Sequence, residues 1–191
     1  MLLKTTKFSL IFFTILLINV YISVKAYRYS LKNTKILVIL EEIRTLESIK
    51  TPSSVLGVSS DSLNSDIRVA TLKSFFRQHN SPLYDHADFI VASADKYNLD
   101  FKLVPAISMQ ESNACRVIPN NSYNCWGWGI YGANVTRFSS YEEAIETVSK
   151  GLKENYIDRG LISADEIMRK YTPGSNGSWA FGVETFLKIL E

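Results

Sequence analysis

Glu111 is the residue of this sequence that is best placed for acid–base chemistry. It lies near the end of residues 103–112, where Val104, Ile107 and Ser108 recur at three- and four-residue spacing and share its face of a helix. Val104 and Ile107 indicate that this face is buried. Because burial disfavours a charged carboxylate, we expect the pKa of Glu111 to be raised, as a general acid working near neutral pH requires.

Aromatic and glycine residues follow this acid in residues 123–132. Aromatic faces suit flat apolar surfaces such as sugar rings, and an amide side chain can hydrogen-bond an acetamido group. An acid followed by an aromatic shelf predicts a glycosidase, although packing in a core explains such aromatic residues equally well. The candidate substrate-binding residues are Tyr123, Asn124, Trp126, Trp128, Tyr131, Tyr171 and Trp179.

The second catalytic group of such a glycosidase is harder to identify. Cleavage needs a proton on the leaving oxygen and a group that stabilises or traps the oxocarbenium-like carbon. No Asp or Glu lies between residues 112 and 141 of the sequence, and Glu142 and Glu143 are the next candidates. Both fall in the first turn of an expected helix, where acids also act as caps. Without them, the acetamido group or a hydroxyl of the substrate would have to attack, with Glu111 as the enzyme's acid.

The elements that must position these residues are mainly helices. Apolar spacing and helix-breaking residues predict helices over about residues 66–78, 84–97, 101–111, 141–159, 164–168 and 178–190. Capping-box spacing occurs for Ser139 with Glu142 or, alternatively, Ser140 with Glu143, and for Ser163 with Glu166. Residues 112–138 lack a helical period. We therefore expect a mainly α fold with a small irregular or β-hairpin lobe.

The N-terminal part of the chain is expected to be a targeting element followed by a spacer. Two lysines precede a nearly uninterrupted apolar run, so residues 1–26 are typical of a signal peptide or an N-terminal hydrophobic membrane helix. Residues 27–47 are expected to form a juxtamembrane helix. Residues 48–65 include seven Ser and predict a linker, which leaves residues 66–191 for the folded domain.

The charge distribution separates these two parts. The net charge is +2, with eight Lys or Arg and four acids in residues 1–65, and thirteen against fifteen in residues 66–191. A slightly acidic domain argues against nucleic-acid binding. The basic residues that follow the apolar run favour a cytosolic domain by the positive-inside rule. We nevertheless expect export, with the domain anchored at the outer face of the cytoplasmic membrane, or secreted if the signal is cleaved.

Two cysteines support export. Cys115 and Cys125 bracket the loop between Glu111 and the tryptophans, and in an oxidising compartment they could form a disulfide. Two buried free thiols are the alternative from sequence. His79 and His86 lie far from both cysteines in the sequence, so we expect no metal site and no cofactor.

In motif order, the chain resembles the lysozyme-like superfamily and, within it, the glucosaminidase family, whose domains are described as mannosyl-glycoprotein endo-β-N-acetylglucosaminidase-like. The resemblance covers roughly residues 85 to 190. The matching segments are Gln110-Glu111-Ser112, Asn124-Cys125-Trp126-Gly127-Trp128, Phe138-Ser139-Ser140-Tyr141-Glu142-Glu143-Ala144-Ile145 and Trp179-Ala180. Departures are Cys125 and Trp126 in place of Leu-Phe, and Trp128 in place of Ile. The Glu-Ser pair also resembles the lytic transglycosylases.

This resemblance implies a lysozyme-like helical domain that cleaves β-1,4 bonds of N-acetylglucosamine-containing glycan in peptidoglycan, with Glu111 as general acid. Lytic transglycosylation is the alternative reaction. A non-catalytic wall-binding module and a structural membrane protein are the alternatives outside catalysis. The expected partners are a peptidoglycan strand and, through the N-terminal helix, the membrane, and we expect a monomer.

Overall fold

The computed structural model describes residues 13–14, 16–28, 37–42, 44 and 60–191. The chain divides into two compact units, Met1–Glu41 and Glu42–Glu191. Residues 16–28 of the first unit are helical. Within the described residues no helix is both long and apolar enough to cross a membrane. The start of the expected apolar run and most of the expected linker lie outside the described residues.

The second unit is built from helices, which confirms the expectation of a mainly α fold. Its elements are α2 (Ser60–Gln78), η1 (Pro82–His86), α3 (Ala87–Tyr97), α4 (Leu103–Ser112), α5 (Tyr141–Asn155), η2 (Ile157–Arg159), α6 (Ala164–Tyr171) and α7 (Ser178–Ile189). Helix α2 begins inside the segment that we expected to be a linker. Residues 60–78 contain no Gly or Pro to stop the helix from extending toward the N-terminus.

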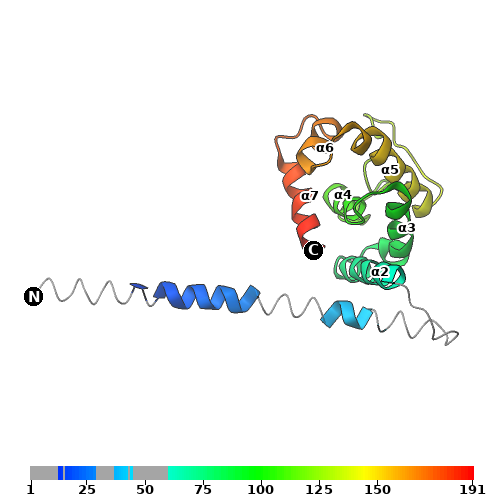
Figure 1. Ribbon diagram of the computed structural model, residues 1–191. Coiled ribbons are helices and arrows are strands. Elements are labelled where there is room, and N and C mark those ends of the chain that lie inside the picture. Colours follow the sequence, from blue (N-terminus) through cyan, green and yellow to red (C-terminus); the bar gives the residue numbers. More distant parts are fainter. Residues whose placement is uncertain (1–12, 15, 29–36, 43, 45–59) are drawn as a thin grey trace, which may run out of the picture. The chain divides into compact units, whose positions relative to one another are not determined.

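Helix α4, which carries Glu111, lies at the centre of this unit, with the other labelled helices around it (Figure 1). It contacts α7 and α5, and most of its residues are buried. Gly182 of α7 leaves room for the Gln110 side chain of α4, because a Cβ atom at that position would lie 1.7 Å from the side-chain oxygen of Gln110. The contact between the two helices brings residues of α7 next to the end of α4.

The segment between α4 and α5 is irregular. The described residues of this segment contain no strand, and residues Tyr131 and Asn134 form one isolated antiparallel bridge. The β-hairpin expected here is therefore not formed, and the irregular alternative describes the segment. The reason is its backbone: residues 113–115 and several later ones, including Gly127, have positive φ angles. Such left-handed turns interrupt any extended run.

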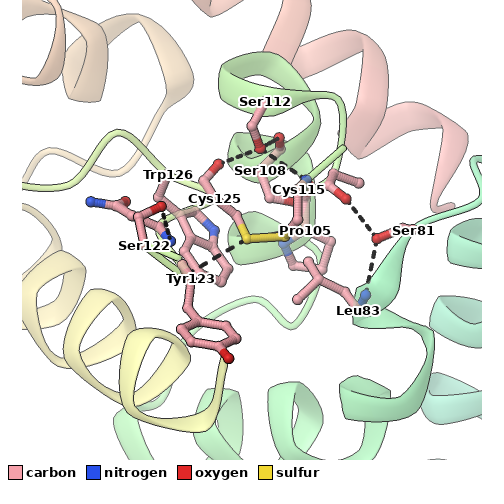
Figure 2. The surroundings of a disulfide bond; sticks show 12 residues. Ser81, Leu83, Pro105, Ser108, Ser112, Cys115, Ser122, Tyr123, Cys125 and Trp126 are labelled. Atoms are coloured by element: carbon pink, nitrogen blue, oxygen red, sulfur yellow. Dashed lines mark hydrogen bonds between the residues drawn. A yellow bond between two sulfur atoms is a disulfide. The ribbon is translucent and has the colours of Figure 1, made fainter. Parts of the chain in front are cut away.

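A disulfide between Cys115 and Cys125 ties this segment to the end of α4 (Figure 2). The hydroxyl of Ser112 donates a hydrogen bond to the Cys125 carbonyl at 2.7 Å and accepts one from the Cys115 N–H at 2.9 Å. Ser112, Cys115 and Cys125 are all buried. The residue after Glu111 therefore holds both ends of the disulfide loop, which fixes the backbone beside the acid.

The capping interactions follow the expected spacing in part. The box of Ser163 and Glu166 at the start of α6 is complete, which confirms that expectation. At the start of α5, the Ser140 hydroxyl accepts a hydrogen bond from the Glu143 N–H at 3.2 Å. The Glu143 carboxylate accepts hydrogen bonds from the Ser139 N–H and hydroxyl, each at 2.6 Å. The alternative box of Ser139 with Glu142 is not formed.

Candidate active site

Glu111 is half-buried in the last turn of α4 and is held there by α7. The indole N–H of Trp179, in the first turn of α7, donates a 2.6 Å hydrogen bond to Glu111 Oε1. Trp179 is itself buried. Two residues 68 positions apart in the sequence thus form a direct pair, and the indole fixes the orientation of the carboxyl group.

The surroundings of Glu111 favour its protonated form. Burial raises the pKa of this carboxyl group, and the hydrogen bond from Trp179 opposes the shift without cancelling it. A raised pKa is the property expected from the helical register. It suits a group that must donate a proton near neutral pH.

The second oxygen of the carboxyl group faces Gly127. A Cβ atom at position 127 would lie 3.0 Å from Glu111 Oε2, and the φ angle of Gly127 is +60°. Glycine is therefore required both for the turn and for the space beside the carboxylate. Because Oε1 accepts the indole N–H, Oε2 is the oxygen that carries the proton when the carboxyl group is protonated.

A pocket of about 450 Å³ begins at this glycine. Its volume lies within the roughly 300–1,000 Å³ that is typical of small-molecule sites. The lining comes from three segments of the second unit: Gly127, Trp128, Gly129, Ile130 and Tyr131; Asn155 and Tyr156; and Lys170, Tyr171 and Pro173. Glu111 adjoins this pocket through Gly127, and the acid therefore lies beside an aromatic cavity.

Four aromatic rings form a continuous cluster: Trp128, Tyr156 and Tyr171 line the pocket, and Trp179 extends the cluster to Glu111. Tyr171 stacks on Trp179 with ring centroids 5.1 Å apart, and Trp128 lies 5.9 Å from Tyr171. Tyr156 completes the cluster, 6.5 Å from Trp128 and 5.9 Å from Tyr171. Gly151 on α5 makes room for the Trp128 ring, since a Cβ atom there would lie 2.2 Å from it. Rings at these separations attract one another, and the cluster forms the aromatic part of the pocket wall.

Tyr171, at the centre of this cluster, is fixed by a hydrogen bond to the backbone. Its hydroxyl donates a 2.6 Å hydrogen bond to the carbonyl of Trp126. Burial raises the pKa of Tyr171 well above its ordinary value, and the negative charges of Glu111 and Tyr156 act in the same direction. The phenol of Tyr171 therefore stays neutral and continues to donate its hydrogen bond to the Trp126 carbonyl.

Two of the candidate binding residues are engaged inside the protein. Trp126 is fully buried and its indole N–H donates to the Val104 carbonyl at 2.9 Å. Asn124 is 2% exposed, and its side chain binds the backbone N–H and carbonyl of Trp128 and the carbonyl of Thr136. Neither residue lines the pocket. In this structure both side chains bind backbone groups and hold the segment that carries Trp128.

The remaining two candidates lie at the surface. Tyr131 lines the pocket and is 78% exposed, so it forms part of the rim. Tyr123 is exposed outside the pocket lining and packs edge-on against Tyr141, with ring centroids 5.0 Å apart. The structure brings Trp128, Tyr131, Tyr171 and Trp179 to the Glu111 region and leaves Tyr123 apart from the pocket.

The two candidate second acids are engaged at the start of α5. Glu142 lies 2.8 Å from Nδ1 of His86, and hydrogen bonds from its own backbone and from Ser140 lower its pKa. Hydrogen bonds from Ser139 lower the pKa of Glu143. Both carboxylates are therefore stabilised in the charged form, and neither lines the pocket. None of the described residues that line it is Asp or Glu.

Five side chains that line the pocket were not among the candidates expected from the sequence: Ile130, Asn155, Tyr156, Lys170 and Pro173. Tyr156 directly follows α5, and Lys170 lies in the last turn of α6, where a basic residue also suits the helix dipole. Gly151, within α5, was the available signal, because a glycine inside a helix often marks a close contact. In the described part of the chain, no three His, Cys, Asp or Glu side chains gather as a metal ion would need.

The sequence matches no protein-family model and none of the curated proteins.

Proposed function

We propose that this protein is a glycosidase that cleaves β-1,4 bonds of N-acetylglucosamine-containing glycan in peptidoglycan, with Glu111 as the general acid. The observation that carries the proposal is the position of Glu111: a half-buried carboxyl group with a raised pKa, next to Gly127 in the lining of an aromatic pocket. The indole of Trp179 binds one of its oxygens, and the other is left to deliver the proton.

The pocket supports a sugar as the ligand. Trp128, Tyr156 and Tyr171 offer ring faces of the kind that stack on the apolar faces of sugar rings. Tyr131 adds a ring at the rim, where an extended glycan would leave the pocket. Gly127 of the pocket lining is next to Glu111 Oε2, so a sugar bound against these rings would lie beside the acid.

The second catalytic group would come from the substrate. None of the described pocket residues is a carboxylate, and Glu142 and Glu143 are held by caps and by His86. The 2-acetamido group of the sugar can act as the nucleophile, as in substrate-assisted glycosidases. Glu111 would first protonate the leaving oxygen and then, as a carboxylate, activate water.

Tyr171 would assist this step through its oxygen. Its proton is engaged with the Trp126 carbonyl, so the oxygen lone pairs remain to face a developing positive charge. A neutral phenol with a strongly raised pKa keeps this arrangement throughout the pH range of catalysis.

Lytic transglycosylation is the second candidate, because the same lack of a pocket carboxylate favours it. In that reaction a hydroxyl of the sugar attacks the anomeric carbon and yields an anhydro sugar. It uses the same acid, which then serves as the base.

The test is to incubate the full-length chain with purified peptidoglycan and to determine the masses of the soluble products. Glu111→Gln is the inactive variant, and Glu184→Gln, an exposed acid of α7, is the matched control. Reducing-end N-acetylglucosamine from the wild type and the control alone would support the glucosaminidase. Anhydro-muropeptides would identify the transglycosylase. Binding to the wall without product release from any of the three proteins would refute catalysis and favour a wall-binding module.

A further inference from the structure

The pocket beside Glu111 carries a positive charge. Among its described lining residues, Lys170 is the one charged side chain, and the others are aromatic, aliphatic, glycine or uncharged polar residues. A glycan built from neutral sugars alone would offer this ammonium group no counter-charge. The position of Lys170 therefore bears on which glycan the pocket accepts.

Contacts from α5 and the residue after it hold Lys170. Its Nζ donates a 2.9 Å hydrogen bond to the Asn155 carbonyl and lies 4.9 Å from the centroid of the Tyr156 ring. An ammonium group has three donors, so this arrangement leaves two N–H groups for a ligand. Both contacts are with pocket residues, which places the charge at the pocket wall.

No carboxylate of the described residues forms an ion pair with Lys170. The neighbouring Arg169 differs, since it pairs with Asp165 at 2.8 Å. Lysines of α5 also have acidic partners: Lys150 lies 3.9 Å from Glu154. Lys170 is thus held in place by a neutral carbonyl and a ring while its charge stays available.

We propose that Lys170 binds a carboxylate of the glycan and makes the pocket selective for anionic strands over neutral ones. This inference rests on the proposed function, in which the pocket binds an amino-sugar polymer. Two N–H donors and one positive charge match one carboxylate. In peptidoglycan that group belongs either to the lactyl substituent of the sugar or to the attached peptide. Lys170 is a specificity-determining residue in this scheme and takes no part in proton transfer.

The test measures binding in the Glu111→Gln background of the full-length chain, by the change in tryptophan fluorescence. The probes are peptide-free glycan strands with free lactyl carboxylates, the same strands after amidation of those carboxylates, peptide-bearing strands, and neutral chitohexaose. Because hydrogen bonds to charged groups are among the stronger ones, Lys170→Met should weaken binding of the carboxylate-bearing strands about tenfold. Binding of amidated strands and chitohexaose should stay unchanged. Loss confined to peptide-bearing strands would assign the carboxylate to the peptide.

Lys150→Met is the matched control, because it removes the same charge from the neighbouring helix α5 outside the pocket lining. It should bind every probe as the parent does. The inference is overturned if Lys170→Met binds the charged probes as tightly as the parent does, or if it loses the same affinity for charged and neutral probes. It is also overturned if the parent binds none of the probes. The two proposals can fail separately. If the wild type releases no product from peptidoglycan but Lys170 still confers selective binding of carboxylate-bearing strands, the catalytic proposal is overturned and the role of Lys170 stands.

Discussion

Replacing Glu111 by Gln should stabilise the folded protein at neutral pH while abolishing activity. Burial disfavours the ionised carboxylate and raises its pKa. Glutamine has the same shape, carries no charge and keeps an oxygen that can accept the indole N–H of Trp179. The variant therefore retains the hydrogen bond and removes the unfavourable burial of charge.

The size of this effect follows from two opposing contributions. Taking an ion out of water costs several kcal/mol when burial is complete, and Glu111 is half-buried. The hydrogen bond from Trp179 stabilises the charged form by about 1.5–3 kcal/mol and so offsets part of this cost. We expect a net gain for Glu111→Gln of about 1 kcal/mol in the free energy of unfolding, which is within the range of single substitutions.

The stability difference between Glu111→Gln and the wild type should depend on pH in a defined direction. Because the pKa of Glu111 is raised by folding, the folded state binds its proton more tightly than the unfolded state does. The wild type is therefore not penalised below the unfolded pKa, and the penalty grows as pH rises through the folded pKa. The advantage of Glu111→Gln should be complete at about pH 8 and vanish at about pH 3.5, since an unperturbed Glu titrates near 4.3.

Urea denaturation of both full-length proteins at the two pH values measures this difference. Glu166→Gln is the control with the opposite sign, because hydrogen bonds from Ser163 and Ile162 lower the pKa of Glu166. That variant should be less stable than the wild type at high pH and approach it in acid. The reasoning is refuted if Glu111→Gln is no more stable than the wild type at about pH 8, or if its advantage persists unchanged at about pH 3.5.

Three further predictions concern residues that position Glu111 or the aromatic rings beside it. Trp179→Phe keeps a ring but removes the N–H that opposes the raised pKa of the acid, so the alkaline limb of the pH–activity profile should move to higher pH. Gly151→Ala should lower activity by displacing the Trp128 ring; a gain of about 1 kcal/mol in stability with full activity, as Ala gives in an unobstructed helix, would show that no clash exists. Replacing Cys115 and Cys125 together by Ala should lower the free energy of unfolding by about 3 kcal/mol in the chain-entropy model, measured by denaturation with and without reductant.

The sequence predicted the helices well because their signals are local. The spacing of apolar residues around Glu111 placed the acid on the buried face of α4, and the Ser163–Glu166 box marked the start of α6. Periodicity and capping depend on residues within a few positions of each other. The same reasoning predicted a raised pKa for Glu111, because the helical register places it on the buried face of α4, where α7 and the Gly127 loop then cover it.

The roles of the loop residues were less predictable because non-local contacts decide them. Asn124 and Trp126 are of residue types that often bind sugars. In the structure, however, Asn124 binds the backbone of Trp128 and Thr136, and Trp126 binds the carbonyl of Val104. A polar side chain in an irregular segment can satisfy either the backbone or a ligand, and the sequence does not distinguish the two. Which partner such a side chain finds depends on the turns of the backbone around it.

The turns themselves are set by covalent and buried polar contacts that together make the acid's surroundings rigid. The left-handed backbone conformation of residues 113–115 after α4 is intrinsically unfavourable for residues other than glycine. The Cys115–Cys125 disulfide and the Ser112 hydroxyl hold these residues in place. This loop presents Gly127 to one oxygen of Glu111, while α7 presents an indole to the other. A carboxyl group can remain half-buried and ready to release its proton only if both neighbours stay fixed, since any loosening would admit water and lower its pKa. The rigidity of the loop is therefore part of what makes Glu111 suitable as an acid.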